Sequence, residues 1–304
     1  MYPSTEPNPV QSPAPQLCAI EPFPNRLERL DKALRDRLRT SLEHIGEVVR
    51  DNPVESEVLK SIETRLSEGQ VSPWVFCLYS KLVAELSKQP RGDVAAATQE
   101  VADAAGRPAA QGILTYKGGE LPSSWWDHFA LLIDTDPQRR FNFAAPTPED
   151  AARCREQIAA GLAMIEEGDP EFAEEVRELA RDIVLAAPAS REDGFNGAST
   201  FFFWGGILLS ATAKRSPIAM VDVLVHESSH VLLFGLSAEG PLTLNNGHER
   251  YASPVRTDKR PIDGIYHAAF VTTRVHSPAN QAAGSSAKSL AGIGCIPPLT
   301  QGRR

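Results

Sequence analysis

Cysteine is scarce in this chain of 304 residues, and its few copies are widely scattered. The four are Cys18, Cys77, Cys154 and Cys295, and none of them belongs to a CxxC pair. This spacing excludes the common cysteine-based zinc and redox motifs. The N-terminal segment also lacks a basic stretch followed by an apolar one, which would mark a secretory signal. We therefore expect reduced thiols and a cytoplasmic location.

Long apolar runs and clusters of positive charge are also missing. The nearest approach to a membrane span, 201–209, contains two glycines and has about half of the length needed. The net charge is −8, and no dense Lys/Arg tract is interleaved with aromatic residues. Such a chain is unsuited to nonspecific binding of nucleic acid. We expect a soluble protein with neither a membrane nor nucleic acid as partner, whose oligomeric state stays unknown.

Proline and leucine patterns divide the chain into four parts. Residues 1–24 are rich in proline, which disfavours helices and sheet ladders, and they predict a disordered leader. From residue 25 apolar residues recur every three or four positions, which predicts a helical module over 25–110. A metal-binding catalytic domain is expected over 111–275. The remainder, 276–304, is rich in Ser, Ala and Gly and predicts an irregular or disordered tail.

Shorter patterns predict a small β component. Strands are expected at 113–116, 125–134 and 141–143, and a buried hairpin at 194–212. Helices are expected to start at Thr147 and Asp169, each followed by proline, and the second to reach about residue 186. The predicted fold class is mainly α with a small β component (α+β), in which a metal-binding helix precedes a second ligand helix.

The pentapeptide His226-Glu227-Ser228-Ser229-His230 is the clearest chemical signal in the chain. Residues four apart share one face of a helix, so both imidazoles can bind one divalent ion. Ser216-Pro217 supplies a helix start, and the stretch from there to Gly235 has no breaker, so the motif falls within a helix. Two histidines do not complete a site, and the third ligand decides between hydrolytic and redox chemistry.

Two residues compete for the third position. Glu249 follows the second histidine at about the distance seen in thermolysin-like zinc peptidases, in which Glu227 would act as the base. Its surroundings, however, are typical of a loop. His267 lies in a stretch of helical composition, 264–271, that is expected to pack beside the first helix.

The loop before His267 favours redox chemistry. It carries Arg256 and Arg260, and arginine binds carboxylates through two parallel hydrogen bonds. An ion with three protein ligands, open positions and a nearby arginine suits an iron(II) oxygenase that binds 2-oxoglutarate. Asp258 is expected to orient an arginine or to offer an alternative metal carboxylate. Trp204 and Phe203 are expected to wall the substrate pocket.

Together these segments resemble the HExxH-motif family of peptide-modification proteins. The match covers residues 195–275 and rests on the pentapeptide, on 253–261 with both arginines, and on 264–271. The family is described as 2-oxoglutarate-dependent peptide β-hydroxylases of ribosomal peptide natural-product (RiPP) pathways. The resemblance implies Fe(II) held by His226, His230 and His267, 2-oxoglutarate held by Arg260 or Arg256, and a supporting role for Glu227 beside the ligands.

Three functions remain open. The leading one is an iron(II)- and 2-oxoglutarate-dependent oxygenase that hydroxylates a side-chain β-carbon of a ribosomally made precursor peptide. The second is a zinc metallopeptidase with Glu249 as the third ligand. The third is an inactive peptide-binding scaffold, which the tail over 276–304 suggests because it lacks the apolar periodicity of further helices.

Overall fold

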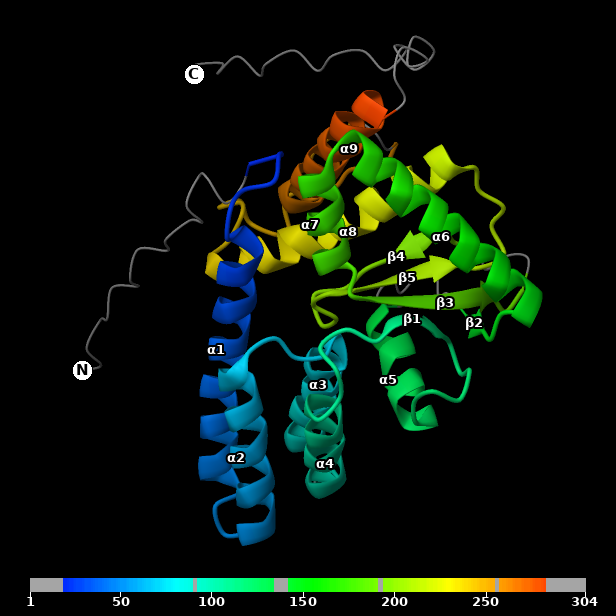
Figure 1. Ribbon diagram of the computed structural model, residues 1–304. Coiled ribbons are helices and arrows are strands. Elements are labelled where there is room, and N and C mark those ends of the chain that lie inside the picture. The colour runs from blue at the N-terminus through cyan, green and yellow to red at the C-terminus, as the bar shows by residue number, and fades with distance from the viewer. Residues whose placement is uncertain (1–18, 90–91, 134–141, 191–193, 255–256, 283–304) are drawn as a thin grey trace, which may run out of the picture.

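The computed structural model describes residues 19–89, 92–133, 142–190, 194–254 and 257–282 (Figure 1). Within these ranges helices predominate, and a small mixed sheet lies among them. The expected fold class, mainly α with a small β component, is confirmed.

Four helices form the amino-terminal part, and three of them start at a residue whose side chain caps the helix. They are α1 (Arg26–Val48), α2 (Pro53–Glu68), α3 (Pro73–Ser87) and α4 (Val94–Ala105). Asn52, Ser72 and Asp93 each accept hydrogen bonds from N–H groups in the first turn of the following helix. These bonds satisfy donors that have no partner within the helix. The apolar stripe of α1 packs against α2. Helix α1 also contacts α8 (Pro217–Glu239), so it connects the amino-terminal helices to the later part of the chain (Figure 1).

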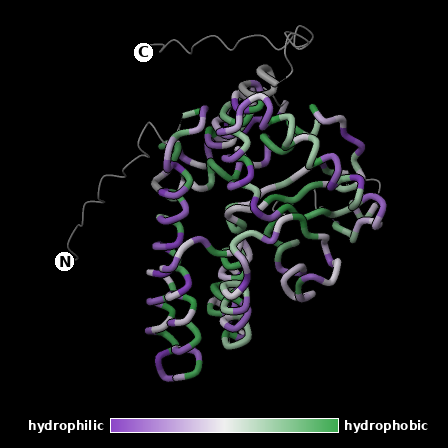
Figure 2. Tube along the Cα trace, viewed as in Figure 1, coloured by the Kyte–Doolittle hydropathy of each residue, from purple (hydrophilic) through white to green (hydrophobic). Residues whose placement is uncertain are grey.

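The sheet has the order β1-β3-β5-β4, and β2 pairs with β3 off this path. Its parallel strands are β1 (Gly112–Thr115), β3 (Asp182–Pro188) and β5 (Gly206–Ser210), and its short antiparallel strands are β2 (Phe143–Ala144) and β4 (Gly197–Ala198). Strands β3 and β5 are buried almost throughout and form a hydrophobic centre in Figure 2. Helices α6 (Pro148–Gly168) and α8 lie on one side of the sheet and α5 (Ser123–Ile133) on the other (Figure 1). Strands covered on both faces have continuous apolar runs rather than alternation.

The prediction of a strand over 125–134 is wrong, because residues 125–133 belong to helix α5; residue 134 lies outside the described residues. The buried residues of α5, Trp125, Trp126, Phe129 and Ile133, recur at the helical period. The rings of Trp125 and Trp126 lie 5.9 and 4.9 Å from that of Trp74 on α3. The aromatic content, typical of strands, obscured a period set by packing against α3. Of the strand expected at 141–143, residue 141 lies outside the described residues and Phe143 begins the two-residue β2.

The helix predicted from Asp169 to about residue 186 ends at Leu179 as α7 (Pro170–Leu179), and the chain continues as β3. A short apolar run such as Ile183-Val184-Leu185 cannot be distinguished from a buried helix by periodicity alone. The hairpin expected over 194–212 is present as β4 and β5, and β5 also pairs with β3.

Both predicted ends of the ordered chain need correction. Residues 1–18 of the expected leader lie outside the described residues, but Ile20 packs against the hydrophobic core. The carbonyls of Ala19 and Ile20 accept hydrogen bonds from the buried guanidinium groups of Arg26 and Arg274. Helix α9 (Ile262–Ala282) continues past the expected tail boundary at 276, and 283–304 lie outside the described residues.

Helix α8 is the central element of the core. Within the described ranges it is the one helix long and apolar enough to cross a membrane, and 67% of that stretch is buried inside the protein. It contacts α1, α6, α7, α9 and the sheet. A helix that is apolar on most of its faces is stable when other elements cover those faces, and this arrangement covers most of α8.

We predict that Asp182 at the start of β3 makes stability depend on pH. Burial raises the pKa of this fully buried carboxyl from 3.8 to about 6, although the N–H of Gln111 and the charge of Arg181 lower it. The folded protein therefore holds this proton more tightly than the unfolded chain, so the stabilisation is complete below about pH 4 and is lost as the pH rises through about 6.

Asp182→Asn should remove this component. The free energy of unfolding of the wild type minus that of the variant should fall, on the order of 2 kcal/mol, between about pH 4 and 6.5. Urea unfolding of both proteins across this range measures the difference. A difference that stays constant with pH would contradict the prediction.

Candidate metal centre

Helix α8 carries the histidine pair on a face that the core leaves uncovered. The hydroxyl of Ser216 accepts a hydrogen bond from the N–H of Ala219, and Pro217 starts the helix. The imidazole centroids of His226 and His230 lie 4.9 Å apart, one turn along the helix. Between them Ser228 and Ser229 are fully buried, and both hydroxyls donate to the carbonyl of Val225. The pentapeptide therefore presents its histidines outward and its serines to the core.

Helix α9 brings His267 to this pair. Its Nδ1 lies 3.4 Å from Nδ1 of His230, and the two ring centroids are 5.7 Å apart. Two nitrogens bound to one ion at about 2.1 Å lie roughly 3.4 Å apart in tetrahedral geometry. In the described part of the chain no group of three His, Cys, Asp or Glu side chains has the full spacing of a metal cluster. The donor chemistry nevertheless fits a divalent ion, since imidazole suits both iron and zinc.

The three imidazoles line one cavity of about 610 Å³. Its walls come from α8, from α9 and from the loop between them. The lining residues are His226, His230, Phe234, Ser253, Arg260, Asp263, Gly264, His267, Ala268, Val271 and Thr272. The cavity thus combines three imidazoles, one guanidinium, one carboxylate and an apolar wall.

Desolvation favours the neutral form of these imidazoles. Burial lowers the pKa of His230 to about 3, and the neighbouring rings of His226 and His267 lower it further. Burial also lowers the pKa of His226 and of His267, and the charge of Asp263 partly offsets the shift at His267. A neutral imidazole has a free lone pair, which is the form that binds a metal.

Glu227 points away from this cavity, toward the edge of the sheet. Its side chain is 5% exposed, and the hydroxyl of Ser199 donates to its Oε2 at 3.1 Å. Burial raises the pKa of this carboxyl to about 7, although the Ser199 hydrogen bond and the charge of Arg215 lower it. Gly197 on β4 lies so close that an added Cβ would be 2.7 Å from Oε1 of Glu227. The carboxyl is enclosed between α8 and β4, where a larger residue than glycine would not fit.

The predicted carboxylate-binding arginine lies in the cavity wall. Arg260 pairs its backbone with that of Tyr251 in an isolated antiparallel bridge, with N···O distances of 2.9 and 2.8 Å. Its Nε lies 2.6 Å from Oδ2 of Asp258, an ion pair rather than an aligned hydrogen bond. Asp258 therefore accompanies the arginine, and it is not among the residues that line the cavity. Arg256 lies outside the described residues.

Three other expected site residues lie elsewhere. Glu249 is exposed on the loop, where its carboxylate accepts a hydrogen bond from the hydroxyl of Tyr251. The expectation that Trp204 and Phe203 wall the pocket is wrong, because both are buried in the core. Phe203 packs on Trp74 and Phe129, with ring centroids 5.1 and 5.0 Å away. The indole of Trp204 donates to Asp31 at 3.0 Å.

Sequence reasoning missed Asp263 and Phe234, which line the cavity. Both carry a signal that periodicity could have found. Phe234 follows His230 by four residues on α8, and Asp263 precedes His267 by four on α9. Residues at this spacing share a helix face with the histidine in question.

No family model matches the sequence, and no curated protein is significantly similar to it.

We predict that His267 and not Glu249 completes the metal site. His267→Ala should weaken Co²⁺ or Zn²⁺ binding by about 100-fold or more, because it removes one of three nitrogens in the cavity. Glu249→Ala should bind within about twofold of the wild type. Titration followed by calorimetry measures both affinities.

His248→Ala is the matched control, since it removes an exposed loop imidazole that does not line the cavity. Loss of metal in Glu249→Ala, with wild-type binding in His267→Ala, would reverse the assignment and support a zinc peptidase.

Proposed function

We propose that this protein is an iron(II)- and 2-oxoglutarate-dependent oxygenase that hydroxylates a side-chain β-carbon of a ribosomally made precursor peptide. The observation that carries the proposal is that His226, His230, His267 and Arg260 line the same cavity. Neutral nitrogen ligands and a guanidinium are the two recognition elements that a metal-chelating dicarboxylic acid requires.

Different residues of the cavity would bind the metal ion and the cosubstrate. When bound, iron and 2-oxoglutarate supply the oxidising power needed to break an unactivated C–H bond. The three histidines would hold the ion, and the neutrality of their rings lets them do so without first losing protons. Pairing of Arg260 Nε with Asp258 leaves the terminal nitrogens of the guanidinium to bind the distal carboxylate.

Apolar side chains at the cavity support a peptide as substrate. Phe234 and Val271 line it and exclude water from the reacting carbon. The ring of Phe201, 44% exposed, lies 6.4 Å from that of Phe234, and Phe202 beside it is 42% exposed. Exposed aromatic residues next to a cavity are typical of surfaces that hold a side chain of a partner.

The position of Glu227 favours the oxygenase over the zinc peptidase. A peptidase base must reach a water molecule on the metal, within the cavity. Glu227 is enclosed on the β4 side of α8 and does not line the cavity. Glu249, the peptidase's third ligand, is exposed on the loop instead.

Turnover tests the proposal directly. Anaerobic loading with Fe²⁺, followed by air, 2-oxoglutarate and a precursor peptide encoded beside the gene, should yield succinate and a peptide heavier by about 16 Da. Mass spectrometry and an enzymatic succinate assay measure the two products. Absence of succinate with every neighbouring peptide would contradict the oxygenase, and a shortened peptide would support the peptidase.

Arg260→Ala should raise the KM for 2-oxoglutarate by roughly 10- to 100-fold, because it removes a charge-assisted bidentate contact. Steady-state kinetics with 2-oxoglutarate as the varied substrate measure this change. Arg250→Ala is the matched control, since that exposed guanidinium donates to the carbonyls of Gly247 and Glu249. Equal KM values for both variants would show that Arg260 does not hold the cosubstrate.

A further inference from the structure

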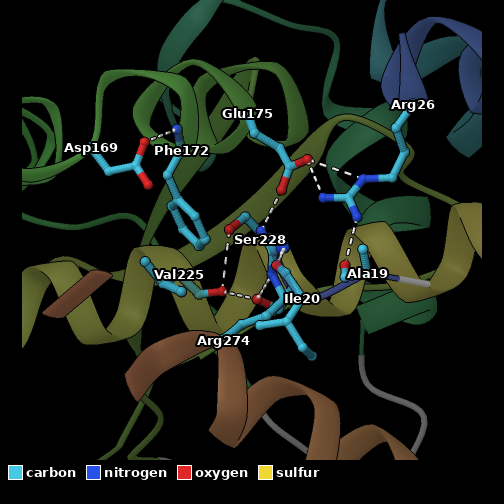
Figure 3. A network of polar contacts seen from close by, with 10 residues as sticks. Ala19, Ile20, Arg26, Asp169, Phe172, Glu175, Val225, Ser228 and Arg274 are labelled. Carbon is cyan, nitrogen blue, oxygen red and sulfur yellow. Dashed lines mark hydrogen bonds and ion pairs between the residues drawn. The ribbon is translucent and has the colours of Figure 1, made fainter. Parts of the chain in front are cut away.

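A cluster of buried charges lies where side chains from α1, α7, α8 and α9 meet (Figure 3). Arg26 of α1 and Arg274 of α9 both pair with Glu175 of α7, and Arg274 also contacts Ser229 of α8. Arg26, Arg274 and Ser229 are 0% exposed and Glu175 is 6% exposed. These side chains lie outside the cavity, and none of the functions considered above uses them.

Each nitrogen of the Arg274 guanidinium donates to a different element. Nε donates to Oγ of Ser229 at 3.0 Å, Nη2 to Oε1 of Glu175, and Nη1 to the carbonyl of Ile20. The ring of Phe172 covers one face of the group, with the guanidinium carbon 4.6 Å from the ring centroid. One side chain therefore fixes α9 against α8, α7 and the segment before α1 at once.

Stability alone does not explain this arrangement. Buried ion pairs often contribute little net stability compared with apolar residues of similar volume, because desolvation offsets the attraction. Their best attested benefit is specificity. They select one register between packed helices when apolar contacts give several registers nearly the same free energy. The Arg274 guanidinium must meet three acceptors at once, on Ser229, Glu175 and Ile20. If α9 were displaced by one residue, these three hydrogen bonds could not all form.

The same contact adjoins two of the three candidate ligands. Ser229 directly precedes His230, and its hydroxyl donates to the carbonyl of Val225 while accepting from Arg274. Arg274 follows His267 by seven residues, about two helical turns, on the same helix. A shift of α9 by one residue would move His267 by about 1.5 Å along the axis and about 100° around it.

We infer that Arg274 is a positioning residue for the metal centre: through Ser229 and Glu175 it sets the register of α9 on α8 and so holds His267 opposite His230. This inference rests on the proposed metal-binding function. It predicts that Arg274 influences metal affinity even though it does not line the cavity.

Arg26 provides a matched control. It is as deeply buried as Arg274 and pairs with the other oxygen of Glu175, and it also donates a hydrogen bond to the carbonyl of Ala19. Arg26→Met therefore breaks the ion pair between Arg26 and Glu175 and leaves the contact between Arg274 and Ser229 in place. Arg274→Met breaks its own ion pair with Glu175 and its contact with Ser229. Ser229→Ala removes the contact with Arg274 and the hydrogen bond to the carbonyl of Val225, but keeps the ion pair.

The experiment is titration of the metal-free full chain with Co²⁺, recording the dissociation constant and the visible absorption spectrum, with thermal unfolding of each protein. Arg274→Met should bind Co²⁺ about 10- to 100-fold more weakly with an altered spectrum, and Ser229→Ala should change in the same direction. Arg26→Met should bind within about threefold of the wild type, even if its loss of Tm is as large.

Three results would overturn the inference. Wild-type affinity and spectrum in both Arg274→Met and Ser229→Ala would show that the contact does not position the ligands. Equal weakening in Arg26→Met and Arg274→Met would assign the effect to general destabilisation. Failure of the wild type to bind Co²⁺ would overturn the proposed function as well, so the two failures are distinguishable. If Arg274→Met does not fold, Ser229→Ala decides the question.

Discussion

The packing of α8 against α9 is the interaction on which the candidate centre depends. Helix α8 is apolar on nearly every face, and the sheet and four helices cover it. Apolar burial is non-directional, so it fixes that α9 lies on α8 without fixing the register. Polar contacts supply the missing information, through the Nδ1 atoms of His230 and His267 and through the Arg274 guanidinium. Apolar burial thus stabilises the packing of α9 on α8, whereas polar contacts fix the register between the two helices.

One pentapeptide of α8 serves two environments. Adjacent residues on a helix point about 100° apart, and His226 and Glu227 have different surroundings. The histidines open onto a cavity of about 610 Å³, whereas the carboxyl of Glu227 is enclosed by β4 and Ser199. A peptidase would need both kinds of side chain in the same space. This division is the reason for which we propose an oxygenase rather than a peptidase.

Sequence patterns correctly predict those elements in which apolar residues still recur at a clear helical period. Helix α1 has a clear apolar stripe, and α8 and α9 follow from the cap at Ser216 and the composition around His267. Strand β3 and helix α5 were assigned to the wrong class because a run buried on both faces, or one dense in tryptophan, carries little periodic signal. Long-range packing, which a single sequence does not encode locally, decided both cases.

In the candidate site, too, local features could be predicted from the sequence and long-range packing could not. The spacing of His226 and His230 is local, so the sequence predicted that they share a helix face, and helical composition placed His267 near them. The burial of Trp204 and Phe203 away from the cavity depended on partners such as Asp31 and Trp74, more than a hundred residues earlier. The role of Ala19 and Ile20 could likewise not be predicted, because their carbonyls accept hydrogen bonds from guanidinium groups on α1 and α9.

The hydrogen bond between Ile20 and Arg274 spans 254 residues of sequence. A chain still attached to the ribosome cannot close this contact until α9 has left the exit tunnel, by which time the earlier helices and strands have had time to form. Contacts between such distant segments are slow to assemble. Any ion that all three imidazoles hold can therefore be bound only once α9, which carries His267, has emerged.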